Sequence, residues 1–84
     1  MKYAVEILRS AQKSLARIQA EDRETLSDAI RKLGDNPRPS GTRKLTGREA
    51  WRLRVGRYRV IYQVFDDRLV VSVISVGHRR DIYR

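Results

Sequence analysis

The sequence contains no cysteine and only one histidine, His78. Without thiols the chain cannot form disulfides or thiolate metal sites, and one histidine without a cluster of acidic residues does not supply the ligands of a zinc site. We therefore expect no metal and no other cofactor. The sequence also lacks the run of about 18 apolar residues that a membrane-spanning helix needs, and its start lacks the hydrophobic core of a signal peptide. These absences predict a cytoplasmic protein with no membrane partner.

Negative charge is scarce, because 10 acidic residues stand against 19 basic residues and give a net charge of +9. The imbalance lies mostly in residues 42–84, which hold eleven basic and four acidic residues, and ten of those eleven are arginine. Arginine binds phosphates through a planar fork and stacks on bases. The charge therefore favours a polyanionic partner, either a nucleic acid or an acidic protein, over a surface that is merely kept soluble by charge.

The 84 residues predict a single domain spanning residues 1–84. Apolar residues at helical spacing predict two amphipathic helices, one capped by Ser10 and running to about Ala20, the other capped by Asp22 and ending at Gly34. Residues 34–50 contain two prolines and three glycines, so we expect an irregular loop there.

Alternating and β-branched segments predict four strands, at residues 2–7, 51–55, 58–65 and 69–76. The last of these is apolar on nearly both faces, which is typical of an interior strand. Short turns join the last three strands into an antiparallel meander. The expected order β-α-α-β-β-β predicts an α+β fold, in which a helical hairpin packs on one face of a small, mainly antiparallel sheet.

The strand at residues 51–55 predicts a cationic sheet face. If Leu53 and Val55 pack beneath the sheet, Arg52 and Arg54 must project from its other side. Pairing across the next turn would place Arg59 beside Arg54 or Arg52. Like charges opposite each other destabilise a sheet, so the cluster indicates either side chains splayed into solvent or an anion-binding site. Trp51, which shares the face of Leu53, is expected to pack in the core.

Few catalytic arrangements are available to this sequence. It has no Ser-His-Asp pattern and no glycine-rich phosphate loop. RNA cleavage needs fewer catalytic groups, because the substrate's own 2′-hydroxyl is the nucleophile. The protein must only orient this hydroxyl, stabilise the phosphorane and transfer protons. Arginines can perform the first two tasks. The titratable groups that could transfer protons are Tyr58, Tyr62, His78 and Tyr83.

Two segments, residues 51–64 and 71–83, together with the helical N-terminal part, resemble the RelE branch of the RelE/ParE toxin superfamily. Their most specific motifs are Tyr-Arg-Val-Ile-Tyr and Val-Gly-His-Arg-Arg-Asp-Ile-Tyr. The resemblance implies a type II toxin that cuts mRNA in the ribosomal A site, using the RNA 2′-hydroxyl without a metal. It also implies a cognate antitoxin that neutralises the toxin, in a hetero-oligomer that binds operator DNA through the antitoxin.

The resemblance implies that five residues bind the scissile phosphate or assist proton transfer: Arg52, Arg54, Arg59, Arg79 and Tyr83. The first two positions are often lysine in RelE proteins, and an arginine is a poor general base because it stays protonated. Tyr83 is therefore the better candidate for the base. Four further residues are candidates for RNA binding: Lys44, Arg57, His78 and Arg80.

Two other functions remain open at this stage. The first is a ParE-like inhibitor of DNA gyrase, which would act by binding a protein on the same fold. The second is a non-catalytic basic module that keeps only antitoxin binding. The joint presence of the arginine cluster and Tyr83 favours the endoribonuclease over both.

Overall fold

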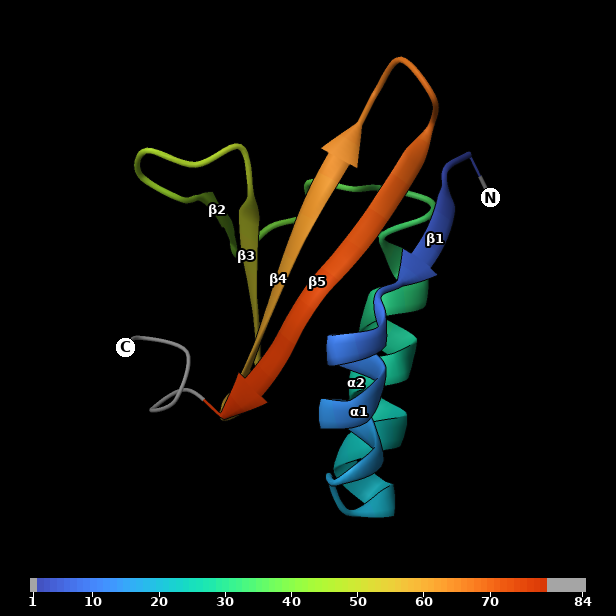
Figure 1. Ribbon diagram of the computed structural model, residues 1–84, viewed down its shortest axis with the longest axis vertical. Helices are drawn as coiled ribbons and strands as arrows, with labels where there is room; N and C mark the ends of the chain where they lie inside the picture. Colours follow the sequence, from blue (N-terminus) through green and yellow to red (C-terminus); the bar gives the residue numbers. More distant parts are fainter. Residues whose placement is uncertain (1, 79–84) are drawn as a thin grey trace.

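The computed structural model describes residues 2–78 of the chain. Within this range it contains two helices and five strands, which form one sheet (Figure 1). In chain order the elements are β1 (Ala4–Ile7), α1 (Arg9–Ala16), α2 (Ala20–Lys32), β2 (Thr42–Lys44), β3 (Trp51–Val55), β4 (Tyr58–Phe65) and β5 (Val70–His78). Neither described helix is long and apolar enough to cross a membrane.

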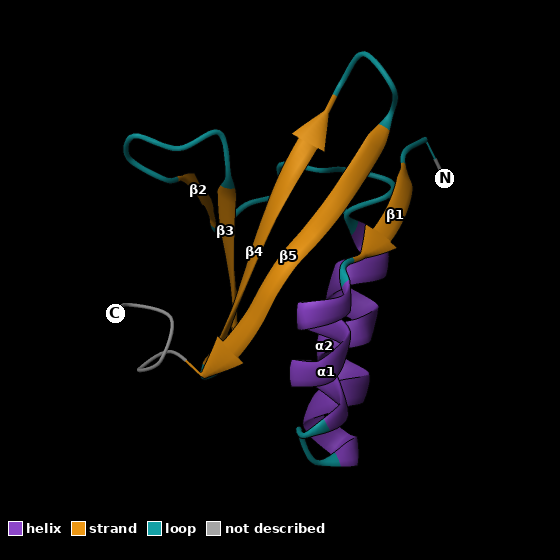
Figure 2. Ribbon diagram, viewed as in Figure 1, coloured by secondary structure: helices purple, strands orange, loops and turns teal. Residues whose placement is uncertain are grey.

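The sheet has the strand order β1-β5-β4-β3-β2. Strand β1 pairs with β5 in parallel, and the remaining pairs are antiparallel. Both helices lie together on one side of the sheet, as Figure 2 shows in purple. The α+β class, the helical hairpin on one sheet face and the mainly antiparallel pairing are therefore confirmed, as is the interior position of β5.

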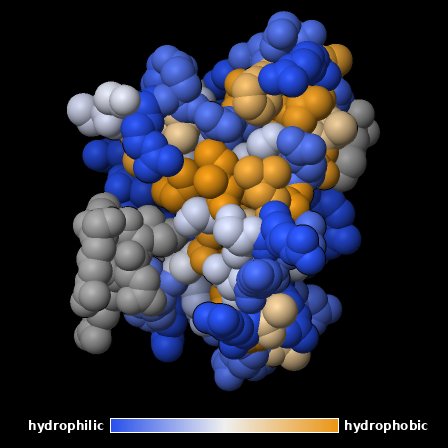
Figure 3. All heavy atoms as spheres, in the orientation of Figure 1, coloured by the Kyte–Doolittle hydropathy of each residue, from blue (hydrophilic) through white to orange (hydrophobic). Residues whose placement is uncertain are grey.

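The core lies between the helices and the sheet because the apolar residues of both alternate toward this interface. Leu15 of α1 and Leu26 and Ile30 of α2 meet Val60 and Val73 of the central strands in one buried cluster. Trp51 is half-buried against this cluster, as its alternation with Leu53 predicts. On the face of the molecule viewed in Figure 3, an apolar band crosses the middle with hydrophilic residues around it.

Both predicted helix caps are wrong. Helix α1 follows Leu8 and α2 follows Gln19, and neither of these residues makes a side-chain capping hydrogen bond. The two expected cap residues are instead used in tertiary contacts. The Ser10 hydroxyl donates to the carbonyl of Ile74 in β5 at 2.9 Å, and Asp22 accepts a hydrogen bond from the Tyr58 hydroxyl at 3.0 Å. Local capping preference was overridden by contacts between the helices and the sheet.

The segment 34–50 differs from the expected irregular loop, because it contains the short strand β2 at the sheet edge. Its first part is fastened by a group that we call the loop clamp. Arg38 pairs with Asp66 at 2.8 Å, and Tyr3 donates to the same carboxylate at 2.6 Å. The Tyr62 hydroxyl donates to the carbonyl of Pro37 at 2.7 Å. The loop clamp therefore consists of Tyr3, Pro37, Arg38, Tyr62 and Asp66.

Candidate functional site

The sheet face opposite the helices carries the predicted arginine cluster. Strand pairing sets Arg54 of β3 directly opposite Arg59 of β4, as the tight turn between these strands predicts. The next row on the same face joins Arg43 of β2 to Arg52 of β3. Four arginines therefore occupy neighbouring positions on three strands, which concentrates positive charge on one part of this face.

The paired arginines have different environments. Arg59 is only 1% exposed, whereas Arg54 on the neighbouring strand is exposed to solvent. On its other side Arg59 pairs with Gly77 of β5, and this glycine adds no side chain to the row that contains Arg54 and Arg59. The sequence left open whether these side chains splay into solvent or form an anion-binding site. The side chain of Arg59 does not splay into solvent. The exposed Arg54 is therefore the member of the pair that can meet an anion from solvent.

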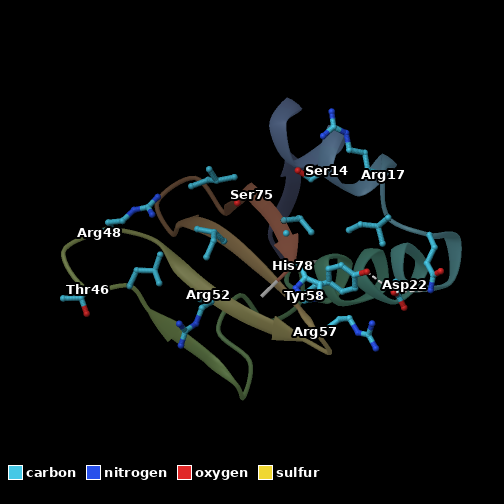
Figure 4. Close-up of a pocket in the computed structure, with 17 residues that line it drawn as sticks. Ser14, Arg17, Asp22, Thr46, Arg48, Arg52, Arg57, Tyr58, Ser75 and His78 are labelled. Atoms are coloured by element: carbon cyan, nitrogen blue, oxygen red, sulfur yellow. Dashed lines mark hydrogen bonds between the residues drawn. The ribbon is translucent and has the colours of Figure 1, made fainter. Parts of the chain in front are cut away.

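A large cleft of about 1120 Å³ opens beside this cluster. Its lining comes from the end of α1, the start of α2, the loop after β2, and the ends of β3, β4 and β5 (Figure 4). Among the described lining residues, the arginines outnumber the single carboxylate, that of Asp22, by four to one. These arginines are Arg17, Arg48, Arg52 and Arg57. The cleft is therefore a cationic recess, and its volume is above the range of about 300–1,000 Å³ typical of small-molecule pockets.

An irregularity in strand β5 shapes the floor of the cleft. Ile61 of β4 pairs with Ser75, whereas the next residue, Tyr62, pairs with Val73, so Ile74 is an extra residue in β5. A bulge of this kind re-aims side chains and often lies next to functional sites. Both Ile74 and Ser75 line the cleft together with Ile61. The bulge thus gives the cleft a partly apolar floor.

At the helical end of the cleft, Tyr58 connects the sheet to α2. Its hydroxyl donates to the carboxylate of Asp22, and its ring meets the ring of His78 edge-on, with centroids 5.8 Å apart. The hydrogen bond to Asp22, followed by burial and the Asp22 charge, raises the pKa of Tyr58, and the nearby Arg57 opposes this shift. Tyr58 therefore holds its proton more tightly than an ordinary tyrosine and is a poor general base.

Tyr62 lies on the other face of the sheet, in the core. Burial raises the pKa of Tyr62 to about 12, and its hydroxyl already donates to Pro37. This tyrosine fastens the loop and does not reach the arginine cluster. Of the four titratable candidates, Tyr58 and Tyr62 are thus poor bases, His78 lines the cleft, and Tyr83 lies outside the described residues.

The structure brings some of the predicted site residues together and separates another. Arg52, Arg54 and Arg59 share one sheet face, and Arg57 and His78 lie at the adjoining cleft. Lys44 lies on the opposite face, paired across the strands with Trp51, and its ammonium group is 3.5 Å from the carboxylate of Glu49. The predictions for Arg79, Arg80 and Tyr83 fall outside the described residues.

Sequence reasoning missed three basic residues at this site. Arg43 was overlooked because β2 was not predicted, since the three residues Thr42-Arg43-Lys44 carry almost no periodic signal. Arg17 and Arg48 were overlooked because only the tertiary fold brings the end of α1 and the β2–β3 loop to the cleft. Among residues 2–78, no group of three or more histidine or acidic residues is placed to hold a metal ion.

Comparison with known proteins extends along nearly the whole chain. A family model described as the ParE toxin of the type II toxin-antitoxin system parDE matches residues 5–83. A protein named as a RelE-like toxin in Escherichia coli is 32% identical over 89 residues, covering 99% of this chain and 92% of its own. A protein named as toxin RelE1 in Methanocaldococcus jannaschii is 30% identical, covering 100% and 98%.

The fold is also similar to that of a toxin in a solved complex. The archaeal RelE–RelB complex from Pyrococcus horikoshii OT3 matches with a TM-score of 0.85 and 26% identity, covering 96% of this chain and 99% of the matched chain. Sequence and fold thus point to the same group of proteins.

Proposed function

Because this chain belongs to the RelE-like branch of the RelE/ParE superfamily of type II toxins, we propose that it is a ribosome-dependent endoribonuclease that cleaves mRNA in the ribosomal A site. The observation that carries this proposal is the opposed pair Arg54 and Arg59 with Arg52 beside the cationic cleft. Such a cluster suits the phosphorane, whose charge rises in the transition state.

In the proposed reaction, the 2′-hydroxyl oxygen attacks the adjacent phosphorus, and the bond from phosphorus to the 5′-oxygen of the next nucleotide breaks. A base takes the 2′-hydroxyl proton, and an acid protonates the departing 5′-oxygen, leaving a 2′,3′-cyclic phosphate and a 5′-hydroxyl. Arg52, Arg54, Arg59 and Arg79 bind the phosphate and stabilise its charge. Tyr83 is the proposed base, since neighbouring cations favour its phenolate form. No step requires a metal.

We assign RNA contacts outside the reacting phosphate to Arg57, His78 and Arg80. The first two line the cleft or its edge, whereas Lys44 is left out because it lies on the other sheet face beside Glu49. We also propose that the chain acts as one cytoplasmic toxin domain with a cognate antitoxin, since the similar archaeal toxin was solved with RelB. The resulting complex would bind operator DNA through the antitoxin. An acidic segment that folds onto the basic surface suits such a partner.

Expression of the wild-type chain, with mapping of mRNA 5′ ends, tests the proposed function. We expect growth arrest with new 5′ ends inside coding regions, and loss of both in Arg59→Ala and Tyr83→Phe. A supercoiling assay with DNA gyrase runs in parallel. Growth arrest without new 5′ ends would overturn the endoribonuclease, and inhibition of gyrase would then favour a ParE-like activity. A chain that does not slow growth would favour a non-catalytic antitoxin-binding module.

A further inference from the structure

Two arginines line the cleft from elements that the proposed catalytic cluster does not use. Arg17 is the residue that ends α1, and Arg48 lies in the loop between β2 and β3. Figure 4 shows them on opposite sides of Ser75, with Arg52 on the strand below. The cleft therefore has a cation on each wall, and its lining includes Arg52 of the proposed catalytic cluster.

Both side chains are exposed, yet their backbones are fixed. The amide of Arg17 donates to the carbonyl of Ser14, and a cation at this end of a helix is favoured by the helix dipole. The amide of Arg48 donates to Leu45, whose own amide donates to the carbonyl of Ala50 at 2.8 Å. These contacts fix the two backbone positions at the cleft walls, and the exposed guanidinium groups can adjust to a ligand from there.

The shape and lining of the cleft suit a polymer better than a single phosphate. Its volume of about 1120 Å³ is above the range of about 300–1,000 Å³ typical of small-molecule pockets. The rings of Tyr58 and His78 at one end offer surfaces on which bases can stack, while the walls offer positive charge to a backbone. Proteins that bind single-stranded nucleic acid combine a positively charged groove with aromatic side chains in this way.

We propose that the cleft binds a short stretch of single-stranded RNA, with Arg17 and Arg48 contacting the phosphates that flank the one held by Arg52. This inference rests on the proposed function, because it assigns the flanking contacts to the same mRNA strand. It separates two roles within the cleft. Arg52 acts on the reacting phosphate, whereas Arg17 and Arg48 set the affinity for the strand and leave the chemical step unchanged.

Binding of a fluorescein-labelled 2′-O-methyl pentanucleotide, which lacks the nucleophile and cannot be cleaved, tests the proposal by fluorescence anisotropy. We expect Arg17→Gln and Arg48→Gln each to weaken binding about three- to ten-fold, and each to reduce the slope of log affinity against log salt by about 0.7, the value for one lost phosphate contact on a single strand. The wild-type protein should bind a dinucleotide more weakly than the pentanucleotide.

Arg9→Gln is the matched control, because it removes the same charge from the other end of α1. It should leave affinity and salt slope close to wild type. Equal behaviour of all three variants, or no wild-type binding, would overturn the proposal. Because the oligonucleotide is not cleaved, this outcome is separate from a failure of the proposed function, which the mRNA 5′ ends report.

A second measurement distinguishes the substrate strand from ribosomal RNA. In cleavage assays on programmed ribosomes, Arg17→Gln and Arg48→Gln should raise KM and leave kcat unchanged. If KM rises while binding of the free oligonucleotide stays at the wild-type level, the two arginines contact ribosomal RNA, and the proposal is overturned.

Discussion

The two ends of the sheet use arginine in opposite ways. At the end that holds the β4–β5 turn, Arg38 forms two hydrogen bonds with Asp66, and its guanidinium lies 5.1 Å from the centre of the Trp51 ring. Toward the other end, Arg54 faces Arg59 next to the β3–β4 turn, and Arg43 faces Arg52 one row nearer the middle of the sheet. The first arrangement pairs a cation with a carboxylate, whereas the second places cations opposite each other on paired strands.

This difference separates structural from functional charge. The loop clamp holds the connection between α2 and β2 against the sheet, which an arginine with a carboxylate and an aromatic ring does well. Like charges directly opposite each other weaken strand pairing. Arg54 is the exposed member of its pair and can meet an anion from solvent, which supports a phosphate site at that end of the sheet.

The largest expected effect comes from exchanging arginine for glutamine at each end. Arg52→Gln should lower the single-turnover rate of mRNA cleavage about 10²–10³-fold, the loss expected when one donor to a transition-state anion is removed, with little change in the thermal unfolding temperature. Arg38→Gln should do the reverse. It should lower the unfolding temperature slightly and leave cleavage near the wild-type rate.

The effect of Arg38→Gln on stability is expected to be small because the side chains of Arg38 and Asp66 are 38% and 57% exposed. Cleavage rates and unfolding temperatures measured on the same preparations would check both variants. If Arg38→Gln slowed cleavage as much as Arg52→Gln, the contrast between the two ends would be lost.

Much of the fold follows from the sequence because its strands alternate clearly. The inward face of β3 and the tight turn after it were enough to predict that Arg59 would lie beside Arg54 or Arg52, and the strand register selects Arg54. Strand β2 was not predictable, since three residues in a segment rich in proline and glycine carry almost no periodic signal. The predicted start residues of the two helices were wrong for another reason. Ser10 and Asp22 form hydrogen bonds with β5 and Tyr58, which only the tertiary fold brings near.

The next effect concerns the buried hydroxyl of the loop clamp. Because burial raises the pKa of Tyr62 to about 12, its protonated form is favoured by folding. The stabilisation of the folded state that results from this raised pKa is fully present below the pKa of the unfolded tyrosine, near 10, and is lost as pH rises toward 12. Two pKa units correspond to roughly 2–3 kcal/mol of unfolding free energy. Urea unfolding between pH 9 and 12 should show this decline.

Tyr62→Phe should flatten that alkaline decline. At pH 7 the variant should lose about 1–2 kcal/mol, since the buried carbonyl of Pro37 is left without its donor. Tyr58→Phe, at the cleft end, is the matched control and should flatten the curve less, because no comparable burial surrounds Tyr58. An unchanged pH dependence in Tyr62→Phe would assign the alkaline decline to other groups.

The candidate site was less predictable than the fold. The arginines of β3 and β4 lie on adjacent strands, so the alternation of residues and the short turn were enough to predict that they lie close together. The cleft required the helical hairpin to pack on the sheet, which brings Arg17 to the far wall, and it required the bulge at Ile74. Neither feature leaves a signal in one sequence, because the first is a long-range packing outcome and the second is a single extra residue in an apolar strand.

The smallest effect measures the stability lost to the opposed arginines. Arg54→Gln removes one of two like charges facing each other across β3 and β4, and Arg54 is the exposed member of the pair. We expect the variant to be more stable by about 0.5 kcal/mol at low salt, within the range for cross-strand pairs, and to cleave mRNA more slowly. The gain should shrink as salt screens the repulsion of the wild-type protein.

Arg31→Gln is the control, because Arg31 pairs with Asp28 on the exposed surface of α2, so its removal relieves no repulsion. A stability gain in Arg54→Gln that persists at 1 M salt would show that charge repulsion is not its cause.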